Sequence, residues 1–180
     1  MAGRVNWQTG HGLLGIYLND HLAGATGGAE LARRMAASGH VPAAEGVLRG
    51  LAVEIAQDRA ALLEIMAALG VQVRGYKIWA GWIGEKAGRL KLNGHLLDRS
   101  PLSNLEELEL LRLGVEGKAA GWRTLRVLAD REERLDAGRL DDLISRARHQ
   151  ADLLEESRVR AAAQITGTYE AAGPGDPAGS

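Results

Sequence analysis

Four side chains that could bind a metal ion fall on or beside apolar stripes of the sequence. His21 recurs among the apolar residues of the first long amphipathic stretch. Asp58 lies at the edge of the second stripe, Glu54 lies on its flank, and Glu116 lies near the centre of the third stretch. Imidazole and carboxylate groups are the ligands that iron and manganese sites use in proteins. These four residues are therefore the candidates for a reduced metal site.

The same residues allow a second interpretation, which we prefer, in which they form a buried polar network. Buried polar groups in native proteins are paired. His21 would meet a carboxylate of the second stretch, and Arg112, Arg123 and Arg158 would supply counter-charges. This interpretation requires no cofactor. The chain also has no cysteine, no Gly-x-Ser-x-Gly and no phosphate-binding loop, so the sequence gives no positive indication of an enzyme.

Amphipathic helices must position these residues, because apolar side chains recur at three- and four-residue steps and runs of β-branched residues are missing. Gly70 is placed to end the second helix, and Ser103 to Glu106 match a capping box that starts the third. The spacing predicts four helices, over residues 12–37, 42–69, 103–130 and 139–165.

One long connection interrupts this pattern. Short links join the first helix to the second and the third to the fourth, whereas residues 71–102 join the second to the third. A single long crossover separates ferritin-like bundles from simple up-down bundles. The chain resembles the ferritin-like superfamily in helix number, helix length and connection pattern over residues 12–165. Residues 1–11 are expected to be a flexible arm, and residues 166–180 a disordered tail.

The resemblance implies inward-facing Glu-x-x-His sequences on two helices, as in the di-iron members of this superfamily. The second helix instead carries Glu54-Ile55-Ala56-Gln57, with glutamine where histidine should stand. The fourth carries Asp152-Leu153-Leu154-Glu155, also without histidine. The resemblance therefore implies a degenerate member of the superfamily, with a reduced iron or manganese site as the alternative.

The sequence of the crossover predicts a separate surface that is both apolar and basic. Trp79 and Trp82 lie at near-helical spacing with other apolar residues, and Arg89 and Lys91 belong to a basic cluster around them. One interpretation is a short amphipathic helix that buries the two tryptophans against the third helix. The others are self-association, and contact with an anionic membrane or nucleic acid. Trp122, on the buried seam of the third helix, is a further candidate for binding or interface contacts.

The third helix also carries a second apolar seam, formed by Leu110, Leu113, Ala120 and Leu128. A helix with two apolar seams has two partners. One is the bundle, and the other is either the crossover or a second subunit, so the second seam is the reason to expect a homodimer. The first helix has a small-residue centre at residues 23–29, which either receives a large side chain or leaves space for a ligand.

Composition sets the remaining expectations. The formal net charge is −1, which gives no strong nucleic-acid signal. No signal peptide and no window of about 18 apolar residues is present, so a cytoplasmic location is expected. We interpret the chain as a non-catalytic helical module for binding or assembly, with the natural ligand or partner unspecified.

Overall fold

The computed structural model describes residues 12–38, 45–74 and 101–171, which contain helices and no strand. This confirms the predicted all-α, four-helix bundle. None of these helices combines the length and the apolar composition needed to cross a membrane. The helices are α1 (Leu13–Ser38), α2 (Glu45–Ala68), α4 (Pro101–Ala129) and α5 (Ala137–Ala171).

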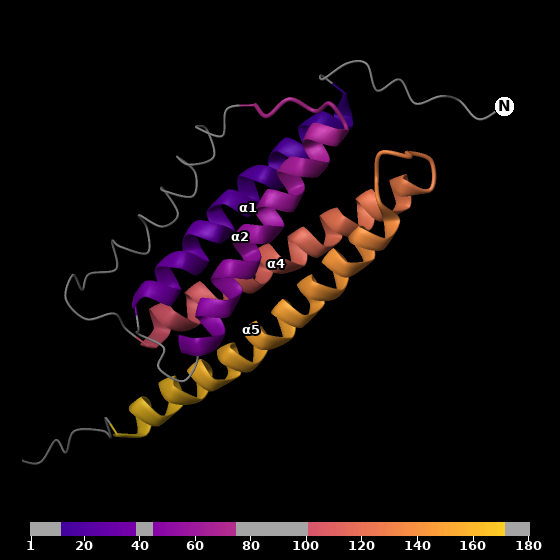
Figure 1. Cartoon of the computed structure of the whole chain (residues 1–180). Helices are drawn as coiled ribbons and strands as arrows, with labels where there is room; N and C mark the ends of the chain where they lie inside the picture. Colours follow the sequence, from indigo (N-terminus) through magenta and orange to yellow (C-terminus); the bar gives the residue numbers. More distant parts are fainter. Residues whose placement is uncertain (1–11, 39–44, 75–100, 172–180) are drawn as a thin grey trace, which may run out of the picture.

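The four helices form two antiparallel hairpins, α1 with α2 and α4 with α5 (Figure 1). The end of α2 and the start of α4 lie at opposite ends of the bundle, which is the arrangement that a long crossover requires. Most of that crossover, the predicted N-terminal arm and the end of the predicted tail lie outside the described residues. Helix α5 continues past Ile165, where we expected it to end, because Gly167 costs a helix only about 1 kcal/mol relative to alanine.

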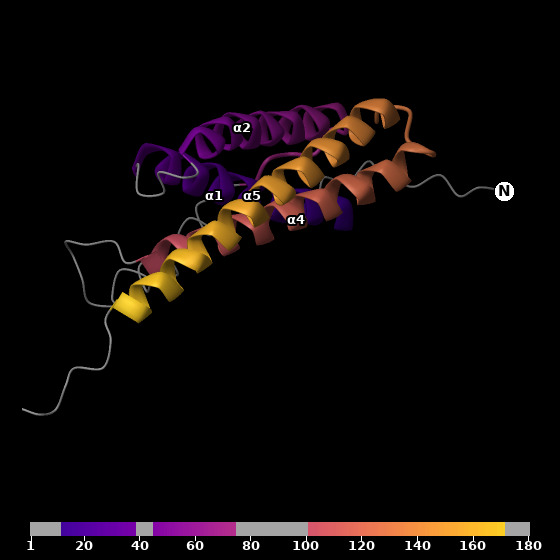
Figure 2. The ribbon, with the colours of Figure 1, turned by 90° about the horizontal axis from the view of Figure 1, so that it is seen from below.

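The two hairpins meet mainly through α1 and α4, whereas α2 and α5 approach each other at few points. Figure 2 shows the hairpins crossing at an angle as two layers. Apolar residues from all four helices form one continuous core between these layers. Polar side chains span the separation between α2 and α5, since Arg139 on α5 pairs with Glu64 on α2.

Local sequence signals account for two helix ends. Gly70 has a φ of +70°, the left-handed conformation that glycine adopts without steric cost. The N–H of Val71 donates to the carbonyl of Met66 at 2.9 Å, and the N–H of Gly70 donates to that of Ala67 at 3.0 Å, which closes α2 with a Schellman motif. At the start of α5, Asp136 Oδ1 accepts a hydrogen bond from the N–H of Arg139 at 3.0 Å.

Candidate functional site

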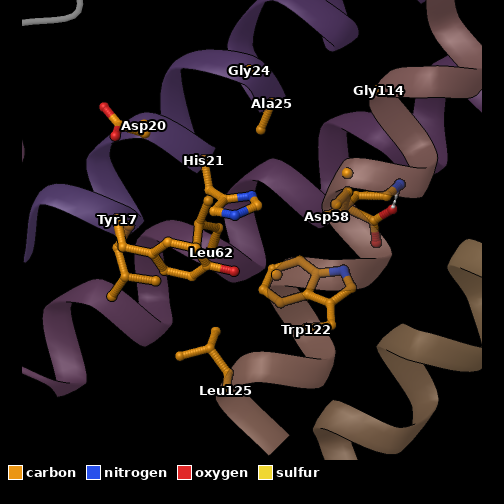
Figure 3. Close-up of a pocket in the computed structure, with 14 residues that line it drawn as sticks. Tyr17, Asp20, His21, Gly24, Ala25, Asp58, Leu62, Gly114, Trp122 and Leu125 are labelled. Carbon is orange, nitrogen blue, oxygen red and sulfur yellow. Dashed lines mark hydrogen bonds and ion pairs between the residues drawn. The ribbon is translucent and has the colours of Figure 1, made fainter. Parts of the chain in front are cut away.

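A cavity of about 420 Å³ lies between α1 and α4, with side chains of α2 on its inner wall (Figure 3). Most of its wall is apolar. Its polar side chains come from all three helices, so the cavity lies where the two hairpins meet. It is lined by Tyr17, Leu18, Asp20, His21, Gly24, Ala25, Asp58, Leu62, Gly114, Gly117, Lys118, Gly121, Trp122 and Leu125.

Small residues on facing helices create this space. Gly24 and Ala25 lie on α1, and Gly114 and Gly117 lie on α4. A Cβ atom added at Gly24, Gly114 or Gly117 would have nothing within 4 Å. All three glycines are exposed, so the cavity opens to solvent along them. Of the two predictions for the centre of α1, the structure therefore favours open space over a filled groove at Gly24.

One end of the cavity is closed by His21, whose ring contacts the ring of Tyr17 edge to face at a centroid distance of 4.4 Å. The Tyr17 hydroxyl donates a hydrogen bond to Thr124 Oγ1 on α4 at 3.0 Å. Partial burial lowers the pKa of His21, and the nearby Asp20 carboxylate opposes this only in part. Burial therefore favours the neutral form of the imidazole at this end of the cavity.

Trp122, on the cavity wall, carries an unpaired polar group. Its side chain is 3% exposed, and its Nε1–H is buried without a hydrogen-bond partner among the described residues. Figure 3 shows the indole across from His21, with its nitrogen edge toward the side where Asp58 lies. Buried N–H groups are nearly always paired, and an unpaired one costs about 1–3 kcal/mol. This donor is therefore left without the acceptor that a buried N–H group normally has.

Asp58, which is 1% exposed, anchors a buried ionic network beside the cavity. Its Oδ2 accepts a hydrogen bond from Lys118 Nζ on α4 at 2.5 Å. Its Oδ1 accepts one from Arg146 on α5. Both carboxylate oxygens are thus held by cations, as a buried charge requires.

Gln150 on α5 extends this network. Its Nε2 donates to Glu54 Oε2 at 2.9 Å and to Asp58 Oδ2 at 3.2 Å. Its Oε1 accepts from Lys118 Nζ at 2.5 Å. The network joins two carboxylates to the cations Lys118 and Arg146, so its formal charges cancel. Burial lowers the pKa of Lys118, and the Asp58 carboxylate partly offsets this effect.

The structure brings together only part of the predicted metal set. His21 and Asp58 both line the cavity, and Glu54 reaches Asp58 through Gln150. Glu116 lies elsewhere on α4, where it is exposed and pairs with Arg112 at 4.0 Å. Within residues 12–38, 45–74 and 101–171, no group of three or more histidine, aspartate or glutamate side chains is arranged to hold a metal ion.

The other predicted residues have different outcomes. Trp122 lines the cavity, whereas Trp79, Trp82, Arg89 and Lys91 lie outside the described residues. Of the arginines expected to serve the network, two pair instead along the α4–α5 face: Arg112 with Glu155 at 3.2 Å, and Arg158 with Glu155 at 2.7 Å.

Three residues of the network, Lys118, Arg146 and Gln150, were missing from the predictions, although the spacing of Lys118 and Gln150 signals them. Lys118 follows Val115 by three residues and precedes Trp122 by four, so it lies along the buried seam of α4. Gln150 follows Ala147 by three residues and precedes Leu154 by four, which places it on the buried stripe of α5. A polar residue at such a position needs a partner from another helix.

Comparisons with known proteins give no relative for this chain: no protein-family model, no curated protein and no solved structure matches it.

Proposed function

We propose that this chain is a non-catalytic, ferritin-like bundle that binds a small, mostly apolar molecule between α1 and α4. One observation carries the proposal: the cavity of about 420 Å³ is lined by Trp122, whose buried Nε1–H has no hydrogen-bond partner among the described residues. Small-molecule sites are concave, mostly apolar spaces of roughly 300–1,000 Å³ with a few polar groups that fix orientation. The cavity has this size and this composition.

The contacts of the charged groups support a binding role rather than a catalytic one. The oxygens of Asp58 accept hydrogen bonds from Lys118 and Arg146, and the ammonium group of Lys118 donates to Asp58 and Gln150. A general acid or base must have a lone pair or proton that can reach a substrate. Both oxygens of Asp58 accept hydrogen bonds within the network, from Lys118, Arg146 and Gln150, which does not suit this carboxylate to act as a general base.

The alternative, an iron or manganese protein, has no support from the described residues. The two oxygens of Asp58 are occupied by cations, and Glu116 pairs with Arg112 away from the cavity. His21 alone among the four candidates remains on the cavity wall without an ion pair among the described residues.

A fluorescence titration with N-phenyl-1-naphthylamine, a neutral apolar probe, tests the proposal. We expect saturable binding at one site, with the blue shift that accompanies burial of the probe. Gly117→Leu fills the cavity and should weaken binding at least tenfold. Gly50→Leu is the matched control, because Gly50 is an exposed helical glycine with open space around it on α2. Absence of saturable binding, or equal binding by both folded variants, would remove the proposal.

Assembly is a second candidate role, favoured by the second apolar seam of α4. Leu110 and Leu113 of that seam are 47% and 66% exposed. Large apolar side chains grouped at a surface mark interaction sites more often than isolated ones do. We propose a homodimer through this seam.

A further inference from the structure

We infer that the ligand of this cavity is a neutral molecule whose apolar body ends in one hydrogen-bond-accepting oxygen, such as a ketone, an ester or an ether. This inference rests on the proposed binding function and deepens it by naming the ligand class. The accepting oxygen would lie against Trp122 and Lys118 of α4, and the apolar body would lie along the glycine faces of α1 and α4.

The unpaired donor of Trp122 sets the first requirement. Trp122 lines the cavity, and its indole Nε1–H is buried and has no partner among the described residues. An indole nitrogen can donate a hydrogen bond but cannot accept one. The group that satisfies it must therefore be an acceptor.

Lys118 supplies a second donor on the same face of α4. It precedes Trp122 by four residues, so the two side chains are neighbours one helical turn apart. An ammonium group has three N–H donors. Two of these meet Asp58 Oδ2 and Gln150 Oε1, each at 2.5 Å, which leaves the third for the cavity. One oxygen placed between Trp122 and Lys118 could accept from both.

The charges around the cavity favour a ligand whose accepting oxygen carries no charge. Glu54 and Asp58 already balance Lys118 and Arg146. Asp20 adds a carboxylate to the cavity wall, and burial lowers the pKa of His21, which favours its uncharged form. A ligand carboxylate would thus bring an uncompensated negative charge into a partly buried site.

The test uses three probes of nearly equal shape: acetophenone, isopropylbenzene, which lacks the oxygen, and benzoate, which is charged. The full ¹⁵N-labelled chain has four indole N–H groups, and loss of one resonance in Trp122→Phe identifies the Trp122 signal. We expect acetophenone to shift this signal downfield, as a new hydrogen bond does. We expect isopropylbenzene to bind without that shift, and benzoate to bind more weakly than acetophenone.

Affinities from the same titrations complete the test. Trp122→Phe should weaken acetophenone binding roughly threefold to tenfold, as one net hydrogen bond predicts, and leave isopropylbenzene binding nearly unchanged.

If both neutral probes bind equally and the indole signal does not move, the accepting oxygen is excluded, while the proposal of an apolar binding cavity stands. If benzoate binds more tightly than acetophenone, the inference that the ligand is neutral is wrong. If no probe binds, the proposed function itself fails. The chemical shift is measured on the unmodified chain, and Trp122→Phe serves there only to assign the signal.

Discussion

The imidazole of His21 on α1 lies against Gly121 on α4 so closely that a Cβ atom added at Gly121 would be 3.0 Å from both its Cε1 and its Nδ1. One turn away, a Cβ atom at Gly117 would have nothing within 4 Å. The glycine face of α4 therefore does two different things. At Gly121 it allows α1 to approach and close the cavity, and at Gly117 it leaves the cavity open.

Alanine substitutions at exposed and buried glycines should separate these two roles. Gly50→Ala should raise the free energy of unfolding by about 0.5–1 kcal/mol, because alanine favours a helix and the added methyl meets no neighbour. Gly121→Ala should gain less than this or lose stability, since its methyl must displace the His21 ring. Urea unfolding monitored by circular dichroism measures both changes.

A double-mutant cycle assigns the difference to His21. In a His21→Ala background the methyl at position 121 has room, so Gly121→Ala should recover the gain seen at Gly50. The same penalty with and without His21 would show that the 3.0 Å approach does not cause it.

The buried ionic network predicts a strong dependence on Asp58. Asp58→Ala would leave Lys118, whose side chain is 11% exposed, and Arg146 facing each other without their shared carboxylate. Removal of one partner from a buried ion pair destabilises proteins by about 3–5 kcal/mol. The midpoint of urea unfolding should therefore fall sharply.

Glu30→Ala is the control for this experiment. It also removes a carboxylate from an ion pair, with Arg33 at 2.7 Å, but both side chains are more than half exposed. Exposed pairs contribute little because water screens them. If Asp58→Ala and Glu30→Ala lower the midpoint of urea unfolding by similar amounts, the buried network around Asp58 stabilises the fold no more than an exposed ion pair does.

Helical periodicity alone was sufficient to predict four helices and the inward position of several polar residues. It placed His21 within one apolar stripe and Asp58 at the edge of another, and both line the cavity. Glu116 was accepted as a candidate for its position near the centre of α4. It lies on an exposed part of α4, where it pairs with Arg112 at 4.0 Å.

The cavity and its unpaired donor depend on packing that spacing does not specify. Trp122 was predicted on a buried seam, but whether its indole nitrogen meets an acceptor depends on how α1 and α2 pack around it. In the same way, the sequence gives the glycines of α4 without saying which one α1 contacts. The choice of Lys118 and Arg146 as partners of Asp58 follows from the register between hairpins, which is a tertiary property.

The exposed seam of α4 predicts that the 19.2 kDa chain forms a dimer at micromolar concentration. Leu113→Lys places a charge on this seam and should shift the mass measured by light scattering toward the monomer. Val53→Lys is the matched control, because Val53 is 59% exposed on α2, away from α4. A monomeric mass for the unmodified chain would exclude the dimer.

The lowered pKa of His21 predicts how the free energy of unfolding depends on pH below neutrality. Its pKa in the folded chain is lowered from the ordinary value of 6.5 by burial. Below about pH 6.5 the unfolded chain therefore binds a proton that the folded chain does not, and stability falls as pH falls. Glu132 and Glu155, whose pKa values are lowered by hydrogen bonds from Arg134 and Arg158, lose their contribution only below about pH 4.5.

The two pH windows can thus be separated by experiment. Urea unfolding between pH 7.5 and 5.0 should show a loss of free energy of unfolding that His21→Gln reduces, because glutamine does not titrate. His149→Gln, at an exposed position on α5, should leave the loss unchanged. If His21→Gln retains the full loss across this range, the burial of His21 does not lower its proton affinity, and the neutral imidazole at the cavity end would have to be abandoned.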